Sequence, residues 1–128
     1  MLLVKTKVAP SSIEGLGLFA AEFILKGTHL WRFVGSFDRA MSVSFVAALE
    51  EPARSFVKKY AYVSPVSGEY ILYSDDSRFF NHANIPNTGE AHVEGEQETH
   101  GIALRDIHPG EELTIDYRLM EGTDKPVF

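Results

Sequence analysis

The chain has 128 residues, is 45% hydrophobic and contains no cysteine. This length suits a single domain over 1–128 with its own core, and the lack of cysteine excludes disulfide frameworks and thiolate zinc sites. The net charge is −6, and no Lys or Arg lies between Arg78 and Arg105, which argues against nucleic acid. This acidic surface is explained either by solubility alone or by attraction of a basic protein partner. No apolar run approaches the ~20 residues of a membrane span, so we expect a soluble cytoplasmic protein with no membrane partner.

Short strands separated by turns are predicted along the first part of the chain. Alternating hydrophobicity predicts a strand over 3–8, not a signal peptide. A turn-rich loop follows at 11–17, and apolar runs predict further strands over 18–23 and 30–34.

A helical insertion is predicted at about 42–62. Ser44 is a candidate N-cap for a short first helix. Pro52 suits the first turn of a second helix, and apolar side chains then recur at offsets 0, 3, 4 and 7 from Ala53.

The pattern returns to that of strands after the insertion. We expect a strand over 70–73, a hairpin over 91–104 that turns at Glu94-Gly95-Glu96, and a last strand over 113–117. Short strands with one helical insertion indicate a mostly-β fold of small sheets.

Three motifs carry the functional information. The first is Glu14 to Ala20, with glycines at 15 and 17. The second is Arg78 to Asn87, which places Asn81 and His82 beside two phenylalanines, and the third is Arg105 to Tyr117. Taken alone, each is explained by an ordinary turn or a hydrogen-bonded polar loop.

Together, in this order and spacing, the motifs resemble the SET domain of protein-lysine methyltransferases. Residues 15–17 are similar to its glycine motif, and 33–35 to its aromatic-x-Gly strand. Residues 78–87 resemble its Arg-Phe-x-Asn-His-x-x-x-Pro-Asn signature, and 112–117 its Glu-Leu-x-x-Asp-Tyr signature. The absence of cysteine is typical of small stand-alone members, of bacterial or viral type, that lack a zinc-binding segment after the domain.

The resemblance implies a β-clip SET fold with a knot-like C-terminal core, in which Asn81-His82 packs against the final strand. It also implies methyl transfer from S-adenosylmethionine to a lysine of a basic protein that is histone-like, DNA-packaging or ribosomal. A second function stays open, because Ala83, Asn84 and Phe33 depart from the family pattern. This alternative is a catalytically inactive module that binds a peptide or the cofactor.

The resemblance also assigns site residues. Tyr117 is the catalytic residue, and it orients the reacting groups without forming a covalent bond. The cofactor-binding residues are Leu16, Gly17, Leu18, Arg78, Asn81, His82 and Tyr117. The substrate-channel residues are Phe33, Tyr62 and Ile115.

Several finer expectations accompany this assignment. Arg78 either anchors the cofactor's carboxylate or pairs with an acidic residue, and we expect the pair. Tyr60 is an alternative to Tyr62 in the channel, and the aliphatic Ile115 suggests room for more than one methyl group. His92 and His100 could face each other across the hairpin, but we expect no metal site.

The tail from 118 to 128 is short for closing a cofactor site, and Phe128 is its one aromatic residue. Either this short tail suffices to close the site, or a second chain helps to complete it, and the second alternative predicts a homodimer.

Overall fold

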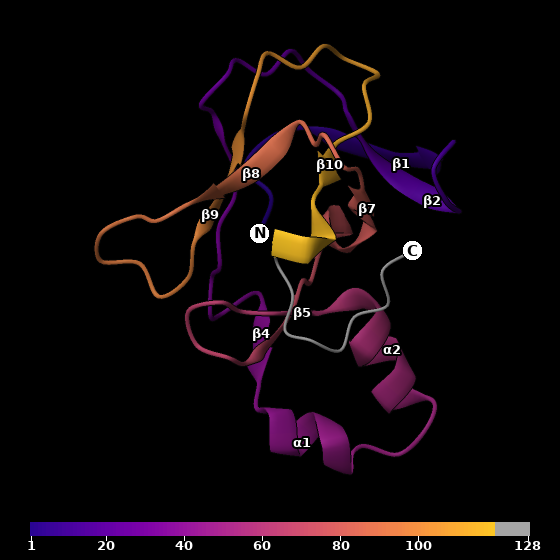
Figure 1. Ribbon diagram of the computed structural model, residues 1–128, viewed down its shortest axis with the longest axis vertical. Helices are drawn as coiled ribbons and strands as arrows, with labels where there is room; N and C mark the ends of the chain where they lie inside the picture. The colour runs from indigo at the N-terminus through magenta and orange to yellow at the C-terminus, as the bar shows by residue number, and fades with distance from the viewer. Residues whose placement is uncertain (120–128) are drawn as a thin grey trace.

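The computed structural model describes residues 1–119, and in that part of the chain short strands form four small sheets (Figure 1). The strands are β1 (Thr6–Pro10), β2 (Leu16–Ala20), β3 (His29–Trp31), β4 (Arg39–Met41), β5 (Tyr62–Val63), β6 (Tyr70–Leu72), β7 (Asn81–His82), β8 (Thr88–Ala91), β9 (His100–Ala103) and β10 (Thr114–Ile115). The helices are α1 (Val43–Ala48) and α2 (Ala53–Tyr60), with 3-10 turns η1 (Asp76–Phe79) and η2 (Tyr117–Leu119). The expected mostly-β fold class is confirmed. The expected tail over 118–128 lies, from residue 120 onward, outside the described residues.

Three of the sheets are antiparallel and one is parallel. β1 pairs with β2, β9 lies between β3 and β8, and β6 lies between β4 and β5, all in antiparallel register. The parallel sheet joins β7 to β10, so that Asn81 lies opposite Thr114 and His82 opposite Ile115. The expected packing of Asn81-His82 against the final strand is therefore confirmed.

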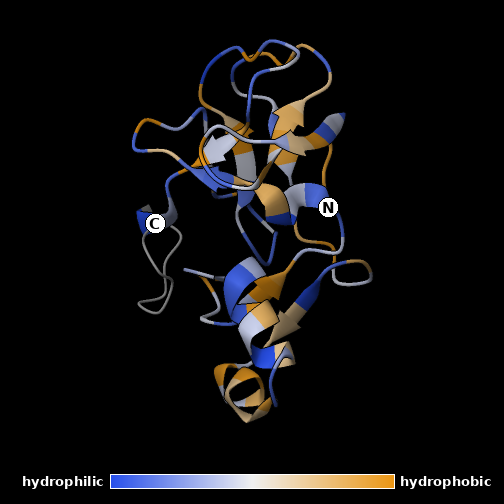
Figure 2. Cartoon of the chain, turned by 90° about the vertical axis from the view of Figure 1, so that its right-hand side faces the viewer, coloured by the Kyte–Doolittle hydropathy of each residue, from blue (hydrophilic) through white to orange (hydrophobic). Residues whose placement is uncertain are grey.

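The helical insertion forms one end of the molecule, away from the β1–β2 pair (Figure 1). Its first helix is capped by Ser42, whose Oγ accepts a hydrogen bond from Phe45 N at 3.1 Å. The expectation that Ser44 is the cap is wrong, because the helix begins one residue before it, at Val43. Figure 2 shows hydrophobic and hydrophilic residues on both helices, as expected of helices that cover a core on one face.

Several strand boundaries differ from the prediction: the strands expected over 18–23 and 30–34 form over Leu16–Ala20 and His29–Trp31, and the hairpin expected over 91–104 consists of Thr88–Ala91 and His100–Ala103. The strand expected from Leu3 begins at Thr6 instead, because Leu3 N donates to Leu30 O at 2.8 Å. The last strand ends at Ile115, and Tyr117 starts a 3-10 turn.

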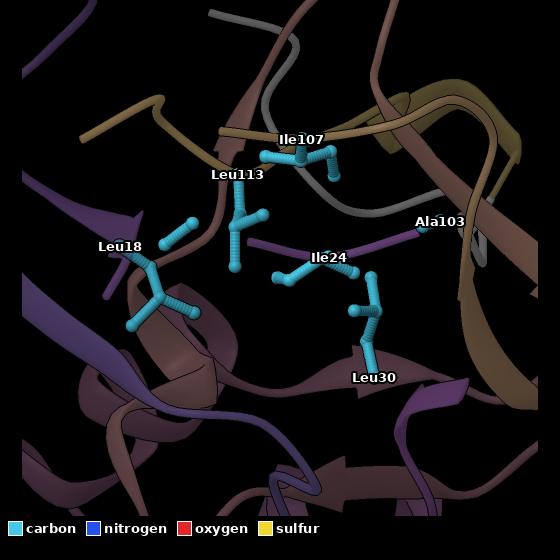
Figure 3. Close-up of a cluster of buried hydrophobic side chains, with 7 residues drawn as sticks. Leu18, Ile24, Leu30, Ala103, Ile107 and Leu113 are labelled. Atoms are coloured by element: carbon cyan, nitrogen blue, oxygen red, sulfur yellow. The ribbon is translucent and has the colours of Figure 1, made fainter. Parts of the chain in front are cut away.

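The largest buried cluster joins residues from distant parts of the chain. Leu18, Ile24, Leu30, Ile107 and Leu113 converge in it, each at most 2% exposed (Figure 3). This cluster fixes the two sequence motifs at 14–20 and 105–117 against each other, because both contribute side chains to it. Among residues 1–119, no helix is long and apolar enough to cross a membrane.

Candidate functional site

Two cavities share Phe80 as a wall. The first, called here the loop-side cavity, has a volume of about 290 Å³ and is lined chiefly by Glu14–Leu16, Lys59, Tyr60, Arg78, Asn81 and Tyr117. The second, called the hairpin-side cavity, also measures about 290 Å³ and is lined chiefly by Trp31, Tyr73, Thr88–Glu90, His92, Ile115 and Asp116. Since Ile115 and Tyr117 are two residues apart and line different cavities, the segment 115–117 also separates the two.

The glycine loop is held by the carboxylate of Glu112. Ser11 Oγ donates to this carboxylate at 2.7 Å, and Asn81 Nδ2 donates to it at 2.9 Å. Asn81 Nδ2 also lies 3.1 Å from the carbonyl oxygen of Leu16. A Cβ atom on Gly17 would lie 2.4 Å from Glu112 Oε2, so any other residue would force the hydrogen-bonded Glu112 carboxylate to shift. Gly17 therefore serves the packing of the loop against Glu112, and it does not line the cavity.

His82 supports the backbone of Tyr117. Tyr117 N donates to His82 Nδ1 at 3.0 Å, while His82 Nε2 lies 3.0 Å from Asn84 Oδ1. A ring that accepts at Nδ1 and donates at Nε2 is the neutral tautomer. His82 thus orders the turn that presents Tyr117, and its side chain does not line the loop-side cavity.

The Tyr117 hydroxyl donates a hydrogen bond to the carbonyl oxygen of Phe80, the residue that both cavities share. Burial raises the pKa of Tyr117 to about 12, and the negative charges of Glu14 and Glu112 add to the effect. The phenol therefore stays protonated at neutral pH, where it can donate and accept hydrogen bonds.

Arg78 places a cation beside the loop-side cavity. Its guanidinium lies 5.9 Å from the centre of the Tyr60 ring and 5.4 Å from that of Phe79. Its Nε is buried without a hydrogen-bond partner, and Arg78 makes no ion pair within residues 1–119. The expected pairing with an acidic residue is thus not found in that range. Lys59 lines the same cavity and adds a second positive charge.

The hairpin-side cavity combines aromatic walls with acidic groups. The rings of Trp31 and Tyr73 meet at 82° with their centroids 4.8 Å apart, so they form two adjoining walls. Ile115, an expected channel residue, lines this cavity. Glu90 also lines it, and burial raises the pKa of this carboxyl above its ordinary value.

Two expected channel residues lie outside both linings. Tyr62 is 3% exposed and packs on Trp31 and Tyr73, so it supports the walls from behind. Phe33 packs against the same buried cluster. Tyr73, and not Tyr62, lines the hairpin-side cavity. Tyr60, the expected alternative to Tyr62 as a channel residue, lines the loop-side cavity.

The structure brings together four of the expected cofactor-binding residues around the loop-side cavity: Leu16, Arg78, Asn81 and Tyr117. Leu18 is fully buried in the core because its side chain points away from the loop. Sequence reasoning missed Lys59 and Trp31. No motif contains them, and only the packing of α2 and β3 brings them to the cavities.

The histidines do not form the pair that was considered across the hairpin. His100 Nδ1 lies 2.8 Å from His29 Nδ1 on β3, because β9 pairs with that strand as well as with β8. In the described range no group of three or more His, Asp or Glu side chains is placed to hold a metal ion.

A model of the SET domain matches residues 15–118. The chain belongs to the SET domain family of protein-lysine methyltransferases. This SET domain is 31% identical, over 91% of its length, to a histone H3 lysine-4-specific N-methyltransferase of Schizosaccharomyces pombe. It is also 31% identical, over 87% of its length, to human histone-lysine N-methyltransferase 2D. The chain spans only 13% and 2% of these two relatives, respectively.

Solved structures agree with the family. A histone methyltransferase candidate from Plasmodium falciparum superposes with a TM-score of 0.62 at 22% identity, covering 91% of this chain and 95% of that one, which shows a shared fold. A Polycomb Repressive Complex 2 from Chaetomium thermophilum, carrying humanizing mutations and a bound inhibitor, superposes with a TM-score of 0.68 at 26% identity. The match covers 89% of this chain and 15% of that one.

Proposed function

We propose that this SET domain transfers a methyl group from S-adenosylmethionine to a lysine of a basic protein. The observation that carries the proposal is the pair of cavities of about 290 Å³ that share Phe80, with Tyr117 on one side and Ile115 on the other. A direct transfer between two bound molecules needs this arrangement, because donor and acceptor must approach from opposite sides of one short passage.

The residues of the loop-side cavity fit S-adenosylmethionine. The buried Nε of Arg78 has no hydrogen-bond partner within residues 1–119. The carboxylate of the cofactor would supply this partner. Lys59 adds charge to the same place, and Leu16, which is 50% exposed, offers an apolar surface to an adenine ring. When bound, the cofactor supplies a methyl group on a positively charged sulfur.

The hairpin-side cavity suits the lysine side chain. Free lysine has a pKa of about 10.4, so its deprotonation at pH 7 costs about 4.6 kcal/mol. The apolar walls formed by Trp31, Tyr73 and Ile115 lower this cost by disfavouring the charged form. Glu90 gives the cavity a negative charge that attracts a basic segment, whereas Asp116 is already paired with Arg118 at 2.8 Å.

Tyr117 would orient the reacting groups. Its hydroxyl is fixed on the carbonyl oxygen of Phe80, and His82 holds its backbone. Oxygen atoms placed in this way can hold the amine and the methyl group in line without a covalent intermediate.

The substrate is proposed as a histone-like, DNA-packaging or ribosomal protein. Support comes from relatives named histone-lysine N-methyltransferases and from the acidic stretch between Arg78 and Arg105. Ile115 in the wall of the hairpin-side cavity supports addition of more than one methyl group, which mass spectrometry of a modified peptide would test. We also propose a homodimer, which light scattering would test.

Methyl transfer is tested with labelled S-adenosylmethionine and a cell extract. We expect Tyr117→Phe to lower kcat about 100-fold with little change in cofactor affinity, since one oriented hydrogen-bond group is lost. Tyr62→Phe is the matched control, because its hydroxyl is buried without a partner in the described residues and lines neither cavity. Absence of both transfer and cofactor binding by calorimetry would refute the enzyme. Cofactor binding without transfer would favour the binding module.

A further inference from the structure

The β1–β2 pair has a free strand edge on β1. Ala21 N donates to Lys5 O at 3.0 Å, and the register continues this alternation, so the odd-numbered residues of β1 bond to β2. Thr6 and Val8 lie between them and direct their N–H and C=O groups away from β2. Within residues 1–119 these outward groups have no hydrogen-bond partner. The backbone of β1 is thus ready to pair with another strand.

The opposite edge of the pair, on β2, is already covered. Ala20 N donates to Glu111 O at 2.9 Å, and Leu113 N donates to Leu18 O at 2.7 Å. The segment 110–113 therefore occupies this edge. Among the described residues, only β1 offers the pair an open edge, and an extended peptide can add to such an edge through main-chain hydrogen bonds.

The face of the pair that points away from the core carries a groove. Side chains of a strand alternate between its two faces. Leu18 and Ala20 are buried in the core, so the outer face carries Phe19 and the residue opposite it, Lys7. A groove of about 430 Å³ lies there, lined chiefly by Lys7, Ala9, Pro10, Phe19, Ala21 and Pro109. Apart from Lys7, the lining is apolar.

The charge of β1 selects its partner. Neither Lys5 nor Lys7 makes an ion pair within residues 1–119. The carboxylates nearby are engaged: Glu111 is in an ion pair at 3.1 Å, Glu22 accepts from Lys5 N at 2.7 Å, and Glu112 accepts two side-chain hydrogen bonds. Pairing of two copies of this short strand would bring lysines together, which is unfavourable. An acidic strand would instead neutralise them.

We propose that the free edge of β1 binds an extended, acidic segment of another protein, and that an apolar side chain of this segment enters the groove. In an antiparallel arrangement, acidic residues lie opposite Lys5 and Lys7, and the apolar residue lies opposite Ala9, whose methyl group leaves the groove open. This partner is distinct from the basic substrate. Figure 1 shows the β1–β2 pair and the tip of the β8–β9 hairpin on opposite sides of the molecule, so the two ligands do not compete.

The probe is the peptide acetyl-Phe-Thr-Glu-Thr-Glu-Thr-amide. Its alternate residues place the phenylalanine opposite Ala9 and the two glutamates opposite Lys7 and Lys5. NMR measures amide hydrogen exchange of the full chain with and without this peptide, titrated into the millimolar range. We expect the amides of Thr6 and Val8 to exchange at least about tenfold more slowly in the complex, because the peptide gives them hydrogen-bond acceptors.

Three control peptides separate the backbone, the charge and the apolar side chain. N-methylation of the threonines at the second and fourth positions removes the two peptide donors that face the edge, and should weaken binding at least about tenfold. Replacing both glutamates by lysine should abolish the slowing of exchange. Replacing the phenylalanine by alanine should weaken binding at least about fivefold, since the groove is left unfilled.

One pair of protein variants tests the role of charge. Lys7→Glu should weaken binding of the glutamate peptide about tenfold and make the lysine peptide the better ligand, because an attraction is replaced by a repulsion. Lys58→Glu is the matched control, since it changes the net charge equally at an exposed position on α2. Methyl transfer should be unchanged in Lys7→Glu, because Lys7 lines neither cavity of the candidate site.

Four results would overturn the inference. The first is unchanged exchange of Thr6 and Val8 with the glutamate peptide, and the second is equal affinity for the glutamate and lysine peptides. The third is an equal loss of affinity in Lys7→Glu and Lys58→Glu. The fourth is slow exchange of the two amides without any peptide: slowing that grows with protein concentration would assign the edge to a second copy, and slowing at every concentration would assign it to the chain itself.

Discussion

At the scale of single residues, Glu112 organises the loop side of the site. Its carboxylate receives hydrogen bonds from Ser11 and Asn81, and it lies so close to Gly17 that a Cβ atom there would force it to shift. Asn81 thereby acts as a positioning residue, because its amide links the glycine loop to the last part of the chain. A motif glycine and a motif asparagine are explained by one shared carboxylate.

Gly17→Ala should therefore destabilise the fold by about 1–3 kcal/mol, the usual cost of inserting an atom into a packed site. Cofactor affinity should fall with it, since Leu16 lines the loop-side cavity. Gly101→Ala is the control, because its new Cβ would meet nothing closer than 3.5 Å. Urea unfolding measures both variants. An equal loss in the two would show that the Glu112 contact does not set the cost.

At the scale of elements, β10 is held by a latch of side chains as well as by its pairing with β7. Asn87, which is 4% exposed, accepts at Oδ1 from Thr114 N at 2.9 Å and donates from Nδ2 to Glu112 O at 2.7 Å. Thr88 Oγ1 donates to Thr114 O at 2.7 Å. A two-residue strand needs such support, because its own ladder supplies few hydrogen bonds.

We expect Asn87→Ala to lower the free energy of unfolding by about 2–4 kcal/mol, since it leaves Thr114 N of β10 and the carbonyl oxygen of Glu112, just before β10, without their partner. Asn84→Ala provides the comparison, because Asn84 is exposed and its side chain hydrogen-bonds only to the His82 ring within residues 1–119. Its cost should stay below about 1 kcal/mol. Thermal unfolding of the two proteins side by side checks this order, and a reversed order would disprove the latch.

At the scale of the whole molecule, buried tyrosines tie stability to alkaline pH. Burial raises the pKa of Tyr73 and Tyr62 well above the ordinary value of 10.0, and that of Tyr117 to about 12. A folded state that keeps these phenols protonated has its full stability below pH 10 and loses it as the pH rises toward 12.

The free energy of unfolding should thus fall above pH 10 by about 1 kcal/mol per pH unit for each of these tyrosines. Urea unfolding at pH 9, 10 and 11 measures the slope. Tyr62→Phe removes one of these ionisable phenols. The free energy of unfolding should then fall less steeply with pH, by about 1 kcal/mol per pH unit. An unchanged slope in that variant would mean that Tyr62 ionises as easily in the folded protein as in the unfolded chain.

The sequence by itself determined the family, the mostly-β fold class and the helical insertion. These follow from local information: turn residues, alternation, helical periodicity and three motifs whose spacing is preserved. It also identified Leu16, Arg78, Asn81 and Tyr117, because the resemblance assigns roles to these motif positions. The structure places all four around one cavity.

Only the tertiary structure decided which side chains face which cavity. Whether Tyr62 or Tyr73 reaches the wall depends on how β5 and β6 pack behind Trp31, and no local pattern records that packing. Gly17 and His82 proved to support the site through contacts with Glu112 and Tyr117, partners more than a quarter of the chain away in sequence.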